Sequence, residues 1–227
     1  MGTLFGNYRL IAPDLASFGL SPASRSEFSL SEHARSVLNA INELAIERLT
    51  VVGVSAGGYV ALHLVEELGA RLQGLVLVNT SIALDSAEIA RWRHELAAET
   101  ELEGVEIVAD ELLPKMIGNS TQRDYPEILN FLRLMVRENT PVGIAAMLRA
   151  LAARTEPSGI LRRIHCPVVC VVGEEDILTP PDTCSLVERI PAALTQRISQ
   201  AGHLPNLERP ETFNDLLVQF MAEFTPA

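Results

Sequence analysis

Basic residues are scarce in this 227-residue sequence, which has 18 lysines and arginines against 29 aspartates and glutamates and a formal net charge of −11. Nucleic-acid binding needs clustered Lys and Arg side chains on phosphates. Anionic membrane surfaces attract the same side chains. The acidic balance therefore argues against a nucleic-acid partner and against a membrane partner.

Cysteines and long apolar runs are also scarce. The three cysteines, Cys166, Cys170 and Cys184, form neither a disulfide framework nor a zinc-binding spacing. A reducing, cytoplasmic location fits them, and no metal site is expected. No run approaches the roughly 20 apolar residues that span a bilayer. Residues 1–6 show no signal-peptide pattern.

Short apolar runs alternate with amphipathic stretches, which is typical of an α/β fold with a mainly parallel sheet and helices on both faces. Helices are predicted after the capping-box pattern of Ser29 and Glu32, over Ala56–Leu68, and from Pro210 onward. Five strands are predicted, at Tyr8–Ala12, Leu49–Val54, Leu75–Asn79, Val168–Gly173 and Leu194–Ile198.

The alternation stops between Thr80 and about Ala153, where only helices are expected. They are predicted at about Asp85–Glu99, Glu103–Met116, Asp124–Glu138 and Pro141–Ala153. A helical insertion between two strands is expected to form a lid over a site. We therefore assign residues 1–80 and 154–227 to the core and 81–153 to the lid, whose last helix returns to the core. Four apolar lid residues are candidates for binding substrate, with packing inside the lid as the alternative: Trp92, Met116, Phe131 and Met135.

The segment Gly53-Val54-Ser55-Ala56-Gly57 lies between an apolar strand and an amphipathic helix, which is the context of a nucleophile elbow. Such a turn strains the serine, and a side chain at either flanking glycine is expected to collide with the neighbouring strand or helix. The hydroxyl then lies at a helix N-terminus, where negative charge is stabilised. An ordinary glycine-rich turn is the alternative interpretation.

A serine nucleophile needs a base, and the base needs an acid that orients it. His203 is the candidate base because it follows the last predicted strand, and catalytic groups gather at the carboxyl edge of a parallel sheet. Asp176 lies furthest out on the loop after the fourth predicted strand and is the candidate acid. Glu174, Glu175 and Asp85 are competitors. The order serine, acid, histidine is the one expected for this type of triad.

The sequence resembles the lid-bearing α/β-hydrolases in four segments, which match the family's fourth strand, elbow, acid loop and histidine loop: Arg9–Leu15, Gly53–Gly57, Gly173–Pro180 and Ala201–His203. Val78-Asn79-Thr80 followed by Trp92 is similar to 3-oxoadipate enol-lactonases and related carboxylesterases. Ser55 departs from the dehalogenase and epoxide hydrolase branches, which have aspartate there. The resemblance implies a cofactor-free hydrolase of small esters or lactones with an acyl-enzyme on Ser55.

The family's first three strands and its His-Gly oxyanion loop have no counterpart in this sequence. The backbone N–H of Ala56 remains as one oxyanion donor, and we predict that the N–H of Leu15 supplies the other. We also predict that Tyr8–Ala12 pairs directly with Leu49–Val54, as the edge of a five-stranded sheet that could recruit a second copy of the chain. The alternative is that the chain lacks its natural N-terminus. Three other functions stay open: a perhydrolase, a C–C bond hydrolase and a non-catalytic ligand-binding relative.

Overall fold

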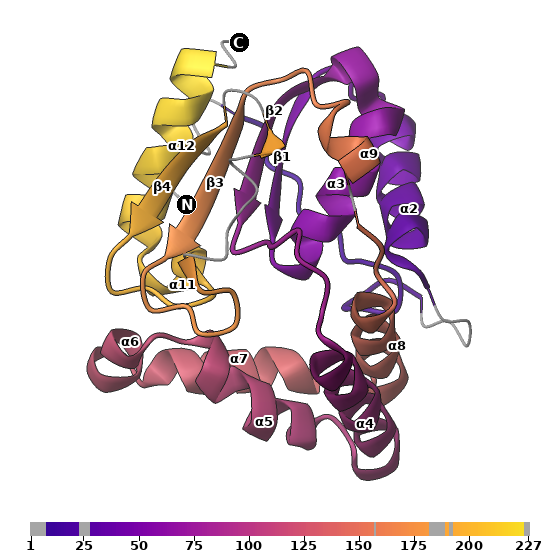
Figure 1. Cartoon of the computed structure of the whole chain (residues 1–227), viewed down its shortest axis with the longest axis vertical. Coiled ribbons are helices and arrows are strands. Elements are labelled where there is room, and N and C mark those ends of the chain that lie inside the picture. The colour runs from indigo at the N-terminus through magenta and orange to yellow at the C-terminus, as the bar shows by residue number, and fades with distance from the viewer. Residues whose placement is uncertain (1–7, 23–27, 157, 182–188, 191–192, 225–227) are drawn as a thin grey trace.

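The computed structural model describes residues 8–22, 28–156, 158–181, 189–190 and 193–224. Within them the chain forms a sheet of four parallel strands in the order β1-β2-β3-β4 (Figure 1). The strands are β1 (Leu49–Val54), β2 (Leu72–Val78), β3 (Val168–Gly173) and β4 (Leu194–Ile198). Four of the five predicted strands are therefore confirmed.

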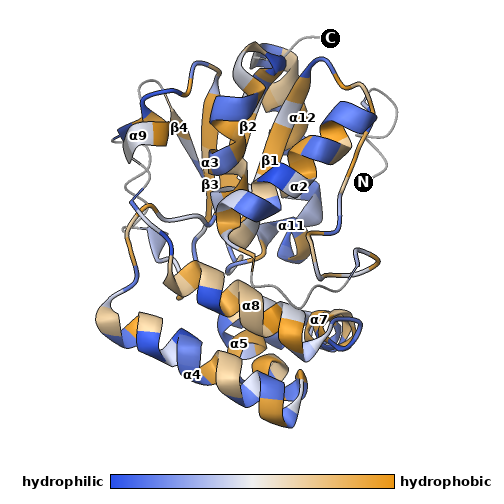
Figure 2. Cartoon of the chain, turned by 90° about the vertical axis from the view of Figure 1, so that its right-hand side faces the viewer, coloured by the Kyte–Doolittle hydropathy of each residue, from blue (hydrophilic) through white to orange (hydrophobic). Residues whose placement is uncertain are grey.

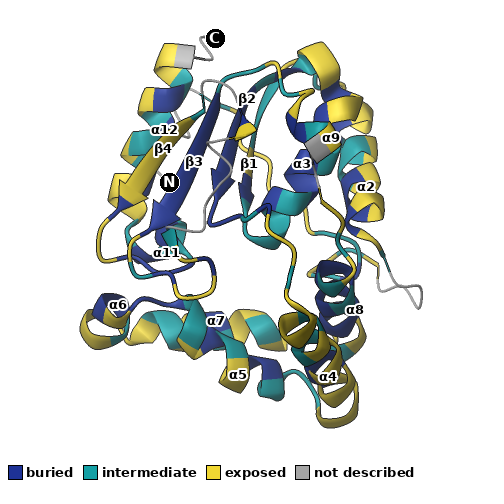
Figure 3. Cartoon of the chain, viewed as in Figure 1, coloured by how far each residue is buried: buried dark blue, intermediate teal, exposed yellow. Residues whose placement is uncertain are grey.

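Helices cover both faces of the sheet. Successive side chains along β2 point to opposite faces and join two different hydrophobic clusters. Leu75 and Leu77 pack with α2 (Leu30–Glu43) and α3 (Ala56–Leu68), while Val76 and Val78 pack with α12 (Pro210–Phe224). This two-residue period is that of a strand. Figure 3 shows β3 buried along its length between these layers. The predicted α/β class is confirmed.

The predicted core helices begin and end for local reasons. Ser29 caps α2 in a capping box, in which its side chain accepts from the Glu32 N–H and the Glu32 carboxylate accepts from the Ser29 N–H. Gly69 ends α3 with a φ of +50°, which glycine adopts at little cost. Two short elements, α9 (Ser158–Leu161) and α11 (Pro205–Glu208), follow the helical segment and β4 respectively. The described helices include none with the length and apolar character that crossing a bilayer requires.

Among the described residues six helices lie between β2 and β3, and the first five form a layer below the carboxyl ends of the strands (Figure 1). We call them the helical layer: α4 (Ala87–Glu103), α5 (Glu106–Met116), α6 (Asn119–Asp124), α7 (Glu127–Arg137) and α8 (Pro141–Ala152). The short helix α6 was not predicted. Figure 2 shows polar and apolar stripes along α4 and α8, whose apolar sides share one cluster. The domain boundaries assigned from the sequence stay a prediction.

The prediction of a strand at Tyr8–Ala12 is wrong. These residues form no strand, and among the described residues β1 pairs only with β2. Leu10 and Ile11 are 41% and 45% exposed, and Val52 on β1 is 42% exposed, as suits an edge strand. The apolar run resembled a buried strand, but no helix covers it, and only Tyr8 packs against the α12 side of the core. The five-stranded sheet is therefore not formed.

An ion-paired aspartate joins the two ends of the helical layer. Asp85, just before α4, contacts Arg93 on α4 at 2.7 Å and Arg154, just after α8, at 2.9 Å. The side chains of Asp85 and Arg154 are 7% and 8% exposed. Burial by itself raises the pKa of Asp85. Hydrogen bonds and charge from the two guanidinium groups outweigh burial and hold the pKa below the ordinary aspartate value of 3.8.

We expect Asp85→Asn to lower the free energy of unfolding by about 3 kcal/mol at neutral pH, because two guanidinium groups lose their carboxylate. A lowered folded-state pKa stabilises fully above the unfolded-state pKa, and this stabilisation is lost as the pH falls through the folded-state value. The difference between the two proteins should therefore shrink as the pH falls below 3.8. Urea unfolding at several pH values measures it.

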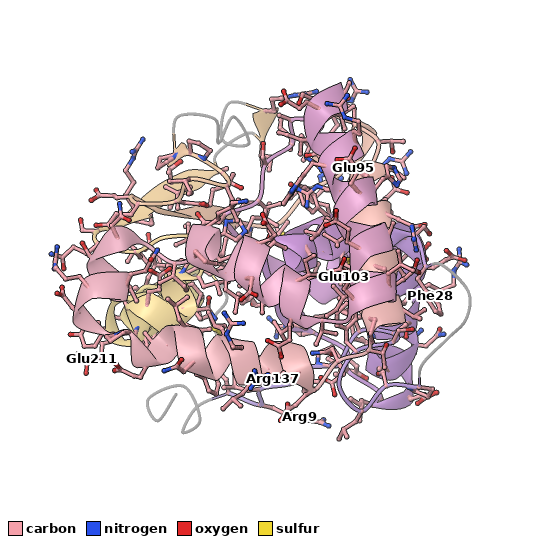
Figure 4. The ribbon with its side chains drawn as sticks, turned by 90° about the horizontal axis from the view of Figure 1, so that it is seen from below. Arg9, Phe28, Glu95, Glu103, Arg137 and Glu211 are labelled. Carbon is pink, nitrogen blue, oxygen red and sulfur yellow. The ribbon has the colours of Figure 1, made fainter. Side chains whose placement is uncertain are left out.

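Glu95→Gln on α4 is the matched control. It removes an ion pair with Arg91 in which both side chains are more than half exposed. Figure 4 shows Glu95 on this helix, in the layer nearest the viewer. We expect a loss below about 0.5 kcal/mol. Equal losses in the two variants would mean that the Asp85 pairs contribute no more than a surface pair.

Candidate active site

Ser55 lies in a strained turn between β1 and α3. Its φ is +50° and its ψ is −114°, a conformation that L-residues rarely adopt. Its N–H donates to the carbonyl of Val78 at 2.8 Å, and its carbonyl accepts from the N–H of Gly58 at 2.9 Å. Strand β2, through Val78, and helix α3, through Gly58, therefore hold the strained backbone in place.

The predicted collision at both flanking glycines is only half right. A Cβ at Gly53 would lie 2.5 Å from the carbonyl oxygen of Gly57, whereas a Cβ at Gly57 would meet nothing within 4 Å. The crowded position is instead Gly58, where a Cβ would lie 1.9 Å from Oγ1 of Thr80. Thr80 is fully buried after β2, and its hydroxyl donates to the carbonyl of Val78 at 3.1 Å. The sequence pattern could not locate this clash, because Thr80 is distant along the chain.

We expect Gly58→Ala to lower the free energy of unfolding by about 1–3 kcal/mol, since the new methyl group overlaps Thr80. Gly57→Ala is the matched control one residue away in the same helix. It should be neutral or stabilise by up to about 1 kcal/mol, because alanine favours the helix and the position is open. Thermal and urea unfolding measure both. Equal destabilisation by the two variants would contradict this assignment.

His203 connects Ser55 to Asp176 through two short hydrogen bonds. Its Nε2 lies 2.7 Å from Oγ of Ser55, and its Nδ1 lies 2.8 Å from Oδ2 of Asp176. His203 and Asp176 are 4% and 3% exposed. A carboxylate can only accept, so it selects the tautomer with hydrogen on Nδ1 and leaves Nε2 to accept the serine proton.

Backbone donors fix the orientation of the Asp176 carboxylate. Its Oδ1 accepts from the N–H groups of Leu178 at 2.8 Å and Thr179 at 3.1 Å. The other oxygen therefore points at His203. All three predicted residues lie on loops at the carboxyl ends of strands, which the parallel sheet brings to one edge.

The competing acids are either exposed or bound to other groups. Glu174 is exposed. The carboxylate of Glu175 accepts from the N–H of Ser120 at 2.8 Å and also bonds the hydroxyl of Ser120. Asp85 is held by its two arginines at the ends of the helical layer. Asp176 is thus the carboxylate that the described structure places on His203.

Asn79 was not recognised as part of the site, although it joins the acid loop to the histidine loop. It is 1% exposed with a φ of +45°. Its Oδ1 accepts from the Gly173 N–H at 3.0 Å, and its Nδ2 donates to the Gly202 carbonyl at 3.0 Å. A polar residue directly after the buried strand β2 was the available signal, but its partners are about a hundred residues away.

The two predicted oxyanion donors lie around one hydrophobic cluster. Ala56, the first residue of α3, has an N–H with no acceptor inside its helix. Leu15 and Ala56 both pack against the cluster formed by α2, α3 and the sheet. The N–H of Gly19 donates to Oδ1 of Asn139 at 3.0 Å, which ties the loop of Leu15 to the helical layer. The oxyanion roles stay a prediction.

The four predicted substrate-binding residues lie in different environments. Met116 is close to His203, because its carbonyl accepts the His203 N–H at 2.8 Å. Trp92 is partly buried in the α4–α8 cluster, with Nζ of Lys115 5.2 Å from its ring centroid. Phe131 and Met135 on α7 are 52% and 45% exposed. Their contacts with substrate stay a prediction, as does the absence of a cofactor.

The arrangement of Ser55, His203 and Asp176 can activate a hydroxyl for attack on a carbonyl carbon. A sequence profile of the alpha/beta hydrolase family matches residues 2–216. The chain belongs to the alpha/beta hydrolase family. Its fold and the names of its relatives support a hydrolase.

Several proteins with known names or structures are similar to this alpha/beta hydrolase. The 3-oxoadipate enol-lactonase 2 of Acinetobacter baylyi is 26% identical over 96% of this chain and 80% of its own length. A thermophilic esterase from Thermogutta terrifontis has a TM-score of 0.94 with 30% identity, over 99% of this chain and 84% of that one. The enol-lactonase of Burkholderia xenovorans LB400 has a TM-score of 0.84 with 25% identity, over 92% and 79%.

Proposed function

We propose that this alpha/beta hydrolase cleaves a small carboxylic ester or lactone through an acyl-enzyme on Ser55. The observation that carries the proposal is the continuous hydrogen-bonded chain from Ser55 Oγ through His203 to Asp176. The esterase and enol-lactonase relatives support ester and lactone bonds as the substrate class.

The reaction proceeds in two halves. His203 Nε2 takes the proton of Ser55 while Oγ bonds to the carbonyl carbon, and the buried Asp176 stabilises the resulting imidazolium. His203 then gives this proton to the leaving alkoxide oxygen, and the acyl group stays on Ser55. Water attacks the acyl-enzyme with His203 as its base, which releases the acid and restores the serine. For a lactone, both products are parts of one hydroxy acid.

Negative charge on the carbonyl oxygen develops beside the N-terminus of α3. There the N–H of Ala56 serves as one oxyanion donor and that of Leu15 as the second. Removing one such donor typically costs about 10²–10³ in kcat. The helical layer acts as the lid, with Trp92, Met116, Phe131 and Met135 as its substrate-contacting side chains.

A fluorophosphonate probe tests this proposal, because it reacts with an activated serine and leaves a stable adduct. We expect stoichiometric labelling of the whole chain, with the adduct mapped by mass spectrometry to the peptide that contains Ser55. Labelling should disappear after heat denaturation. An unlabelled protein that binds small ligands without cleaving p-nitrophenyl acetate would favour the non-catalytic alternative instead.

A further inference from the structure

Glu208 is a buried carboxylate with no role in the reaction steps above. It is 3% exposed, at the end of α11 and five residues after His203. Its Oε1 accepts from the N–H groups of Gly202 at 2.9 Å and Leu204 at 3.1 Å, the two residues that flank His203. Burying a charge is costly unless such donors compensate it.

The second oxygen of Glu208 reaches the helical layer. Its Oε2 accepts from the N–H of Gly118, between α5 and α6, at 2.9 Å. The N–H of His203 itself donates to the carbonyl of Met116 at 2.8 Å. Three consecutive amides, at residues 202–204, are therefore held by Glu208, by the helical layer and by Glu208 again.

The segment between α5 and α6 and the loop of His203 approach each other so closely that each carries a glycine at the contact, Gly118 and Gly202. A Cβ at Gly118 would lie 2.9 Å from the Gly202 nitrogen and 2.6 Å from Oε2 of Glu175. A Cβ at Gly202 would lie 2.3 Å from the Gly118 nitrogen. The contact is therefore made by backbone atoms of both segments, and the Glu208 side chain accepts hydrogen bonds from both of them.

We propose that Glu208 is a positioning residue that fixes His203 and couples it to the segment of the helical layer at residues 116–118. The proposal rests on the function proposed above, since it assigns the imidazole of His203 as the base. Displacing that segment shifts the His203 backbone, and with it the distance from Nε2 to Ser55. The α5–α6 end of the helical layer is thereby a fixed part of the catalytic framework.

Glu208→Gln tests the coupling with little change in side-chain size. The amide oxygen can accept on one side only, and on the other side its NH₂ group faces a backbone N–H. One of the two ties, to the histidine loop or to the helical layer, is therefore lost. We expect kcat for p-nitrophenyl acetate to fall about 10–100-fold with KM within about threefold, because small misplacements of a base act on the reaction step.

Glu211→Gln is the matched control, with the same chemical change in the first turn of α12. Glu211 is exposed, and Figure 4 shows it at the periphery of the molecule. Its activity should equal that of the wild type. Glu208→Asp keeps the charge but is too short to reach all three amides, so its loss of kcat should be smaller than that of Glu208→Gln.

The proton NMR signal of the His203 Nδ1–H, assigned with the variant His203→Gln, provides a readout independent of turnover. We expect Glu208→Gln to broaden or shift it and the control to leave it unchanged. If Glu208→Gln does not fold, Gly118→Ala approaches the same contact from the helical layer and should give the same signature. A wild-type protein without esterase activity or probe labelling would reject the proposed function, while the NMR comparison would still decide the positioning role. If Glu208→Gln lowers the melting temperature but leaves kcat and the His203 Nδ1–H signal unchanged, the positioning role of Glu208 is overturned.

Discussion

Ser55→Ala is expected to lower kcat for p-nitrophenyl acetate by about 10⁵-fold, because it removes the proposed attacking atom, the hydroxyl oxygen that hydrogen-bonds to His203. Oγ is the only atom removed, and its hydrogen bond to His203 is only partly buried. The free energy of unfolding should therefore change by less than about 1 kcal/mol. Esterase assays and thermal unfolding of the same preparations measure the two effects.

Ser199→Ala is the control for this substitution. Ser199 is exposed in the turn after β4, four residues before His203. It should keep wild-type activity. Turnover by Ser55→Ala equal to that of the wild type would reject Ser55 as the nucleophile, and parallel losses of activity and folding would mean that the serine is structural.

Asp176→Asn is expected to lower kcat by about 10⁴-fold with the fold intact. The N–H groups of Leu178 and Thr179 hold the asparagine carbonyl where Oδ1 now lies, so its NH₂ group faces His203. The imidazole must then accept on Nδ1 and carry its hydrogen on Nε2. In that tautomer Nε2 cannot take the proton of Ser55.

Glu174→Gln on the same loop is the control for Asp176→Asn. It also replaces a carboxylate by an amide, but its side chain is exposed. We expect activity within twofold of the wild type. If Glu174→Gln loses as much activity as Asp176→Asn, the assignment of Asp176 as the acid is wrong.

Four of the strands, the core helices and the loops that carry Ser55, Asp176 and His203 could be predicted because their signals are local. Ser29 and Glu32 form their capping box within one turn. The apolar runs at β1 and β3 indicate strands without any knowledge of what packs against them. Ser55 is marked by the glycines around it. His203 and Asp176 follow strands, so a parallel sheet must bring their loops to one edge.

The failures have the opposite cause, since they depend on partners that are distant along the chain. The run at Tyr8–Ala12 has strand character, but only packing reveals that no helix covers it. Likewise, Gly57 lies in the motif yet has open space, while Gly58 meets Thr80. A local pattern records which residue type occurs, and a steric clash depends on what lies opposite.

The site around Ser55 shows which features the sequence determined and which depended on tertiary packing. The sequence by itself determined the class of fold and placed Ser55, Asp176 and His203 on loops after strands, because these follow from short-range periodicity and from general properties of parallel sheets. The tertiary structure decided how His203 is held. Asn79, Met116 and Glu208 contact its loop from three separate elements, and hydrogen bonds between distant segments form only when packing brings their donors and acceptors within about 3 Å.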